Sequence, residues 1–496
     1  MLGTPEIDGV RVLHIPGPEG FTETSLSFTV GVVDEPLVAA GVAHLIEHLA
    51  MHAARRLPID INATVDLERT DFYAAGSPAR VATFLRLVCE SLSDLPLDRL
   101  DVEKGVLEAE GASGCHPVAA LLLSSRYGAT GAGVTAYAGP GYEGITADQV
   151  RDFAGRWFVA ANAVLKVRGE LPPDLRLPLP GGDRGSHVRA HGRVAQGPTL
   201  VSGDFPGAAV MLRLPAGDPA LLDVQVVSIL KARIDEECRF VAGNSYSLGQ
   251  VDVTGDDGND DVVVHIDARE GKDAEVARAV VRTVFELSEH GPTAVELEHA
   301  QALIDEDWRG PAHHVYVRAR EIAYELLDLA PPQRIDLTAV HRVDADQVRS
   351  CIRAALPEVV FYVPASVVDE VATLDLPHVP TCPVVDGLAT GLLFRPGLGI
   401  RVISREARRA RLVLTATGLA HTDDRSRHHQ VDWLDIAGVM KVRADLLVVY
   451  GVGGCVVPVG RALFRGGDRV YDEVLTRVED ALVFEAPVGM KQAMQS

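Results

Sequence analysis

The chain of 496 residues repeats one succession of predicted strands and helices, and this repetition constrains its fold more than any other feature. Each copy opens with two extended apolar segments, continues with a helical pattern and two further strands, and ends with several amphipathic helices and a last strand. The predicted strands lie near residues 10–15, 25–33, 60–65, 70–75 and 163–169 in the first copy and near 199–202, 207–214, 245–253, 260–267 and 359–363 in the second. Matching order in two halves predicts a duplicated α+β domain.

The linker between these halves and the end of the chain have different sequence patterns. We expect a first half over residues 1–175, a linker over 176–197, a second half over 198–382 and a C-terminal domain over 383–496. The linker is rich in Gly, Pro and basic residues, which favours flexibility. The C-terminal part alternates short apolar strands with turns and ends on an amphipathic helix near 469–482, a pattern that resembles a small pleckstrin-homology-type barrel. We interpret this part as a docking or dimerisation module.

A short segment in the first half carries side chains that can bind a metal. Residues 41–53 read GVAHLIEHLAMHA, with His44, Glu47 and His48 spaced so that they lie on one face of a helix. Two imidazoles one turn apart supply half of a zinc site, and the glutamate beside them is a candidate general base. For this segment alone, the alternative is a structural helix that happens to carry two histidines.

A third metal ligand is expected on another element, because catalytic zinc usually has three protein ligands and one open position. The segment DVEKGVLEAEG, residues 101–111, offers Glu103 and Glu110. Seven residues make two helical turns, so both carboxylates lie on one face. One of them could bind the metal and the other could support it. For any single glutamate here, the alternative is a solvated helix face.

Together these segments resemble the insulinase family, the inverted zincins that include pitrilysin and the mitochondrial processing peptidases. In that family the H-x-x-E-H helix precedes a strand with an Asn-Ala pair, then a Thr-x-Phe/Tyr strand, then a helix with two glutamates seven apart. This chain has Asn62-Ala63, then Thr70-Asp71-Phe72, then the two glutamates named above. One departure is an interval between His48 and Asn62 that is shorter than usual for the family, and we expect it to alter the rim of the site.

The resemblance implies a role for each residue of the site. His44, His48 and Glu110 would bind one Zn²⁺, Glu47 would act as the general base, and Glu103 would steady the site from behind. It also implies that the strand with Asn62, Ala63 and Thr64 receives the substrate as an added strand.

A second motif lies far downstream, at residues 239–247, which read RFVAGNSYS. Arg239, Gly243 and Tyr246 match the family's spacing, and the resemblance implies that Arg239 and Tyr246 reach across from the second half to the peptide carbonyl. A guanidinium and a phenol can both donate hydrogen bonds to an oxygen that gains charge. The alternative is an arginine that caps a helix and a tyrosine on a strand.

Charge and composition limit the classes of partner that the chain is expected to bind. The formal net charge of −22 at pH 7 disfavours nucleic acid and anionic membranes as general partners. The chain contains no run of 18 apolar residues, so we expect no integral membrane segment. The first 20 residues do not have the pattern of a secretion signal. The six cysteines have no C-x-x-C pairing and are interpreted as reduced thiols, so we expect a cytoplasmic protein.

The sequence therefore predicts a zinc metalloendopeptidase that cleaves peptides or unfolded segments, with processing of a precursor or leader peptide as one such task. The resemblance implies two halves that face each other like a clamshell and close on the peptide. Its alternative is a non-catalytic or weakly active subunit or scaffold of a heteromeric peptidase of the same family. The sequence leaves open whether the chain works alone, as a homodimer or as a heterodimer with a paired homologue.

Overall fold

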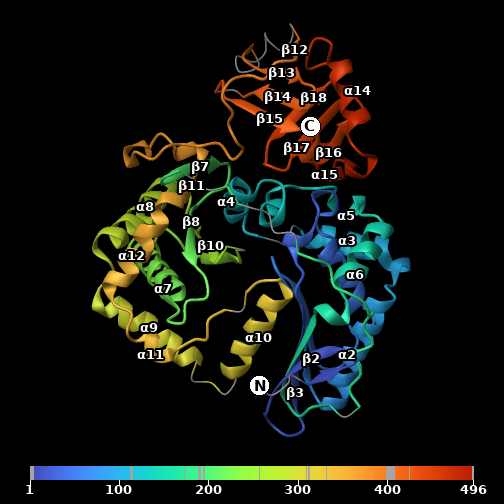
Figure 1. The fold of residues 1–496 in the computed structure, drawn as a ribbon, viewed down its shortest axis with the longest axis vertical. Helices are drawn as coiled ribbons and strands as arrows, with labels where there is room; N and C mark the ends of the chain where they lie inside the picture. Colours follow the sequence, from blue (N-terminus) through green and yellow to red (C-terminus); the bar gives the residue numbers. More distant parts are fainter. Residues whose placement is uncertain are drawn as a thin grey trace.

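A computed structural model gives the fold and describes most of the chain. The described residues are 5–111, 115–172, 174–187, 192–193, 196–255, 257–308, 310, 313–330, 332–397, 408–423 and 425–493. In Figure 1 the first half (blue to cyan) and the second half (green to yellow-orange) face each other, and the C-terminal domain (orange to red) lies at one end of both. The predicted α+β fold with duplicated halves and a β-rich C-terminal domain is confirmed.

The first half is a six-stranded sheet in the order β1-β2-β6-β3-β5-β4. The strands are β1 (Glu6–Ile7), β2 (Val10–Ile15), β3 (Thr22–Phe28), β4 (Asp60–Val65), β5 (Thr70–Gly76) and β6 (Ala163–Gly169). Its longer helices are α1 (Val42–Met51), α2 (Pro78–Ser93), α3 (Leu100–Glu110) and α6 (Ala147–Trp157). Apolar side chains on one face of the sheet, such as Leu26 and Phe72, are buried against Leu45, Phe84 and Phe153 of these helices.

The five-stranded sheet of the second half, ordered β7-β11-β8-β10-β9, repeats the order β2-β6-β3-β5-β4 of the first, and β1 has no counterpart among the described residues. Its strands are β7 (Thr199–Gly203), β8 (Ala208–Pro215), β9 (Leu248–Val253), β10 (Asn259–Ile266) and β11 (Val360–Pro364). Its helices are α7 (Leu222–Asp235), α8 (Asp273–His290), α9 (Ala294–Trp308), α10 (His313–Leu326), α11 (Leu337–Val340) and α12 (Ala345–Ala355). The parallel pair β7–β11 takes the place of the parallel pair β2–β6, which indicates duplication of the whole unit.

The two halves exchange one helix each. Helix α4 (Pro117–Tyr127) follows α3 in the chain, but Leu122 and Leu123 pack on the sheet of the second half, against Met211 and Tyr362. Helix α10 of the second half packs in return on the sheet of the first half, where Ile322 contacts the cluster that contains Leu13. Figure 1 shows both helices at the junction between the sheets. Each sheet therefore packs its own helices on one face and a helix of the other half on part of the opposite face.

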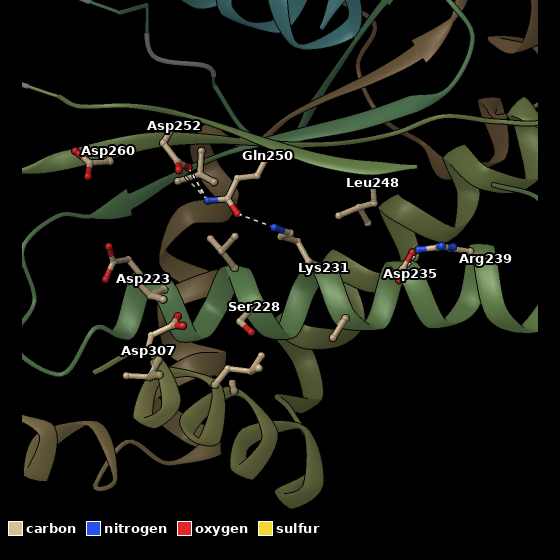
Figure 2. A pocket seen from close by; sticks show the side chains of 17 residues that line it. Asp223, Ser228, Lys231, Asp235, Arg239, Leu248, Gln250, Asp252, Asp260 and Asp307 are labelled. Carbon is tan, nitrogen blue, oxygen red and sulfur yellow. Dashed lines mark hydrogen bonds and ion pairs between the residues drawn. The ribbon is translucent and has the colours of Figure 1, made fainter. Parts of the chain in front are cut away.

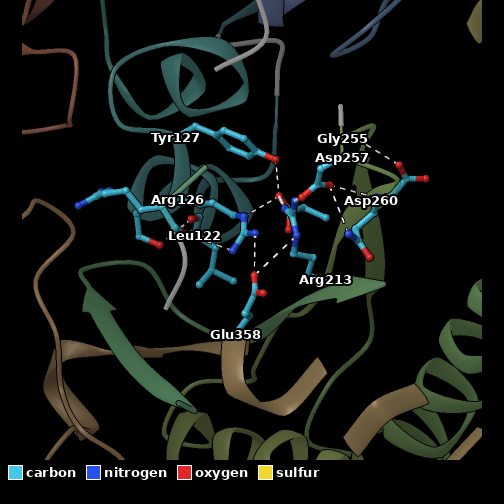
Figure 3. A network of polar contacts seen from close by, with 12 residues as sticks. Leu122, Arg126, Tyr127, Arg213, Gly255, Asp257, Asp260 and Glu358 are labelled. Carbon is cyan, nitrogen blue, oxygen red and sulfur yellow. Dashed lines mark hydrogen bonds and ion pairs between the residues drawn. The ribbon is translucent and has the colours of Figure 1, made fainter. Parts of the chain in front are cut away.

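A buried polar network reinforces this junction (Figure 3). The guanidinium Nε of Arg126, on α4, lies 2.7 Å from Oδ2 of Asp261, on β10, and both side chains are 1% exposed. Tyr127 donates a hydrogen bond from its hydroxyl to the same carboxylate, and Arg213 lies 3.4 Å from it. Opening of the two halves would have to break these contacts or move α4 with the second half.

The described part of the predicted linker packs against both halves. Leu177 is fully buried in the first-half core, and the imidazole Nδ1 of His187 lies 2.8 Å from Asp34. Arg184 pairs with Asp328 just beyond α10, at 2.6 Å. This part packs because apolar side chains alternate with its prolines and glycines. Residues 188–191 and 194–195 of the predicted linker lie outside the described residues.

The C-terminal domain has two four-stranded sheets, ordered β12-β13-β14-β15 and β18-β17-β16-β19. The strands are β12 (Leu392–Phe394), β13 (Arg411–Leu414), β14 (Gly418–Thr422), β15 (His428–Asp432), β16 (Ile436–Arg443), β17 (Leu446–Gly451), β18 (Val456–Gly460) and β19 (Val483–Glu485). The helix expected near 469–482 spans Gly467–Arg477 (α14) and is followed by β19 and α15 (Val488–Ala493), so it is not the last element. The pleckstrin-homology resemblance stays a prediction. Among the described residues, no helix is long and apolar enough to cross a membrane.

Candidate metal centre

Helix α1 is positioned by its first turn. Glu35 accepts hydrogen bonds from the backbone N–H groups of Gly41 and Ala43, at 2.7 and 2.8 Å, which occupies two donors that a helix start leaves without an intrahelical partner. Burial raises the pKa of Glu35 to about 7, and those two hydrogen bonds oppose the rise. Gly41 has a φ of 96°, and a Cβ there would stand 2.8 Å from the ring of Tyr142, so only glycine suits this start. Leu45 and Ile46 are fully buried on the core side, which turns the polar face of α1 toward α3.

The predicted ligands converge on that face. The Nε2 atoms of His44 and His48 lie 3.9 and 3.7 Å from the same oxygen, Oε2 of Glu110 at the end of α3. Zinc takes nitrogen and oxygen ligands at about 2.0–2.1 Å in a tetrahedron, which sets its ligands about 3.4 Å apart. The three atoms would need to close by a few tenths of an ångström. Two imidazoles and a carboxylate of this spacing fit Zn²⁺.

Two further side chains hold the imidazoles. Glu103, on α3, lies 3.7 Å from Nδ1 of His48, and Arg99 and His52 contact the same carboxylate at 3.3 and 3.4 Å. The hydroxyl of Tyr142 lies 3.2 Å from Nδ1 of His44. Such partners orient metal-binding histidines and fix the nitrogen that faces the metal. Tyr142 was missed by the sequence analysis, since it lies nearly a hundred residues from His44 and in no motif.

Glu47 is the buried acid of the cluster, at 7% exposed. Its Oε2 lies 3.5 Å from Nε2 of His44, and burial together with the nearby Glu110 raises its pKa to about 8. Burial and the neighbouring His48 lower the pKa of His44 to about 4, so this imidazole is neutral and keeps a lone pair for a metal. A divalent cation among these groups would favour the ionised form of both carboxyls. The cluster can therefore hold a cation and a proton acceptor side by side.

The predicted substrate strand is β4, the outermost strand of its sheet. Asn62 and Thr64 are exposed on it, and Ala63 is half-buried. Strand β4 pairs in antiparallel register with β5 on one side, and its other side is the sheet edge. An edge strand presents backbone groups that an extended peptide can pair with. The role of these three residues in binding stays a prediction.

Arg239 and Tyr246 belong to the second half. Arg239 lies in a π-helical turn, Glu236–Val241, that continues α7, and its guanidinium is 3.8 Å from Asp235. Tyr246 is 74% exposed in the segment before β9, and its backbone N–H donates to Asp267. A π-helical turn is often a functional feature, because it breaks the regular ladder of the helix. The approach of both side chains to the histidines stays a prediction.

Arg239 borders a pocket of about 640 Å³ between α7, α9, β9 and β10 (Figure 2). By the duplicated topology this pocket takes the place that the His44–His48–Glu110 cluster has between α1, α3 and β4. Its lining carries aspartates and two cations instead of histidines; the charged residues are Asp223, Lys231, Asp235, Arg239, Asp252, Asp260 and Asp307. The two equivalent places of the duplicated fold therefore carry different chemistry.

Comparisons with known proteins identify the class of fold. No protein-family model and no curated protein matches the chain. Among solved structures, the peptidase M16 inactive domain from Pseudomonas fluorescens is similar at a TM-score of 0.56 and 16% identity, covering 72% of this chain and 96% of that one. A protease from Helicobacter pylori is similar at 0.57 and 15%, covering 72% and 97%.

A third similar structure is a mutant of the ferredoxin protease FusC in complex with Arabidopsis ferredoxin, at a TM-score of 0.52 and 13% identity. That match covers 84% of this chain and 55% of that one. The chain therefore has the fold of M16 peptidases, and its resemblance to the insulinase type is confirmed for the fold. At these sequence identities the matches show how the helices and strands are arranged. An argument for catalysis has to come from the residues of this chain.

Proposed function

We propose that the chain is a zinc-dependent endopeptidase that cleaves peptides or unfolded segments, with precursor or leader processing among its tasks. One observation carries the proposal: Nε2 of His44 and Nε2 of His48 converge on Oε2 of Glu110, with Glu47 buried beside them. The likeness in fold to M16 peptidases supports it.

Each residue of the cluster has a separate task in this proposal. Zn²⁺ bound by His44, His48 and Glu110 would lower the pKa of water and polarise the peptide carbonyl. Glu47 would take the proton of the attacking water and then pass it to the leaving amine. Glu103 and Tyr142 would keep the two imidazole rings in the orientation that binding needs, through the contacts described above.

The substrate would lie along β4 as an added strand, which places a peptide carbonyl next to α1. This pairing would use hydrogen bonds to the backbone of an extended chain, so it would favour peptides and unfolded segments over folded proteins. Arg239 and Tyr246 would donate hydrogen bonds to the oxyanion when the halves approach, each worth about 2–4 kcal/mol in the transition state. The net charge of −22 is compatible with neutral or cationic peptides. We also propose a cytoplasmic location.

The test is zinc content and peptide cleavage by the purified full chain and by Glu47→Gln. We expect one Zn²⁺ at this centre in both proteins and cleavage of a mixed peptide library by the native chain alone, because the substitution removes the base and leaves the three ligands. Glu90→Gln is the matched control, since Glu90 pairs with Arg86 on the exposed face of α2. Full activity of the Glu47→Gln protein would contradict the role of the base.

A second candidate is a non-catalytic or weakly active subunit of a heteromeric peptidase. Two observations favour it: one similar structure is described as an inactive domain, and Arg239 pairs with Asp235 on the second half. In that case the purified chain would bind zinc without cleaving the library, and activity would appear only with a paired homologue. Sedimentation would separate a monomer or homodimer from such a heterodimer.

A further inference from the structure

Two cysteines and a histidine from distant parts of the chain meet in the C-terminal region. They are Cys382, in the segment that leaves the second half, His429 on β15, and Cys455 in the turn between β17 and β18. One ligand atom of each lies within 4.8 Å of the other two, and Sγ of Cys382 is 3.1 Å from Nδ1 of His429. His429 and Cys455 are 1% and 2% exposed. We propose that these three side chains bind a thiophilic divalent cation, with Zn²⁺ as the first choice.

The geometry and the donors fit such an ion. Zinc binds thiolate sulfur at about 2.3 Å and imidazole nitrogen at about 2.0–2.1 Å, which separates neighbouring ligand atoms by about 3.5–3.8 Å. The cluster meets this spacing after small side-chain movements. The carbonyl oxygen of Pro383 lies 2.7 Å from the same Nδ1 of His429, and metal binding would replace that contact. Two sulfurs and one nitrogen leave a fourth position for water or another donor.

The surroundings of His429 resemble those of a metal-binding imidazole. Its Nε2 lies 3.3 Å from Oδ2 of Asp423, and this oxygen would accept a hydrogen bond from the Nε2–H group when Nδ1 binds the metal. Arg427 holds the same carboxylate at 2.6 Å. On the neighbouring strand, His421 stacks on His429 at 4.9 Å, and its buried Nε2 has no hydrogen-bond partner among the described residues. His421 therefore lies next to the site without belonging to the cluster.

The site would tie three segments together at the junction of the C-terminal domain with the two halves. The turn that carries Cys455 also contacts the first half, where Ala129 donates its backbone N–H to the carbonyl of Val452 at 3.0 Å. Next to Cys382, the carbonyl of Thr381 accepts a hydrogen bond from Arg193. A metal here would fix the position of the C-terminal domain. This inference stands apart from the peptidase proposal, since it uses none of the residues of α1 or α3.

Cobalt distinguishes this site from the one on α1. The full chain, reduced and freed of metal, is titrated with Co²⁺ under nitrogen, because only thiolate ligands give an intense near-ultraviolet charge-transfer band. We expect this band in the native chain and in His48→Ala, and its loss in Cys382→Ser and Cys455→Ser. Cys115→Ser is the matched control, since Cys115 is a half-buried thiol outside the cluster. Zinc content should fall by one ion per chain in either cysteine variant of the cluster.

The native protein alone also tests the site, which keeps the test valid if a variant does not fold. Alkylation followed by peptide mapping should show Cys382 and Cys455 protected in the zinc-loaded chain and modified after chelation. Absence of the sulfur band in the native chain would overturn the proposal. So would equal alkylation with and without zinc, or a Cys382–Cys455 disulfide in protein purified under reducing conditions.

Discussion

Replacing Arg126 by Met should weaken the junction between the halves more than any exposed substitution. The Arg126 guanidinium is buried on α4 and contacts Asp261 of the other half at 2.7 Å and Glu358 at 3.2 Å. Met has similar length and no charge, so the change isolates the loss of the cation. Breaking a buried pair by removing one partner costs about 3–5 kcal/mol, because the remaining charge stays buried.

The contacts that remain after the substitution put the expected loss of stability near the lower end of this range. After Arg126→Met, Asp261 still accepts a hydrogen bond from Tyr127 and lies 3.4 Å from Arg213, so we expect a loss of about 3 kcal/mol. Asp261→Asn should cost a similar amount, since it leaves Arg126 with Glu358 alone as a charged partner. The double variant should lose only about 4 kcal/mol, because both single changes remove the same contact, which gives a coupling of about 2 kcal/mol.

Urea unfolding of the full chain measures these values through its three tryptophans. Trp157 lies in the first half, Trp308 in the second and Trp433 in the C-terminal domain, so variants that keep one tryptophan each report on one part. The transitions of the two halves should move together in Arg126→Met. Arg86→Met is the control, because the exposed Arg86–Glu90 pair on α2 is worth at most about 0.5 kcal/mol. A coupling under about 0.5 kcal/mol, or a loss equal to that of the control, would refute the reasoning.

Three further predictions concern single contacts. Arg233 binds Glu296 at 2.7 Å between α7 and α9, and this hydrogen bond lowers the pKa of Glu296 to about 2. Because this native pKa lies below the usual glutamate pKa of 4.5, the stabilisation is present above pH 4.5 and is lost as pH falls toward 2. Glu296→Gln should therefore lower the free energy of unfolding by about 1 kcal/mol at pH 7 and by almost nothing near pH 2. Equal losses at the two pH values would contradict this role of the ion pair. Tyr142→Phe removes the hydroxyl near His44 and should weaken zinc binding about 10-fold in chelator competition, whereas unchanged affinity would exclude an orienting role. A substrate peptide can be N-methylated at a backbone nitrogen next to the cleaved bond. If the peptide pairs with β4, its kcat/KM should fall about 5-fold, since one backbone hydrogen bond is worth about 1 kcal/mol. Cleavage at the unmodified rate at each position tested would exclude strand addition.

The sequence predicted the elements that local periodicity determines. The H-x-x-E-H spacing placed His44, Glu47 and His48 on one face of a helix, and the seven-residue spacing placed Glu103 and Glu110 on another, because a helix turns every 3.6 residues whatever surrounds it. Boundaries were less accurate. The second predicted strand spans Thr22–Phe28 instead of 25–33, because Gly31 starts a turn in which its N–H donates to Asp34 at 3.0 Å.

The same limit applies near the end of the chain. The helix expected to continue to residue 482 ends at Arg477, and the segment after it pairs in parallel with β16 as β19. Pairing with a strand some forty residues earlier leaves no local signal, so periodicity alone extended the helix too far.

What the sequence determined by itself was the repeated order of elements, the face of each helix and the chemistry that each face carries. Only the tertiary structure decided which faces meet: that α1 and α3 bring their side chains together, that Tyr142 supports His44, that α4 and α10 cross to the other half, and that Cys382, His429 and Cys455 form one cluster. The physical reason is the range of the interactions. Side-chain direction follows from backbone geometry within a few residues, whereas contacts between distant segments follow from the packing of whole sheets and helices into shared cores.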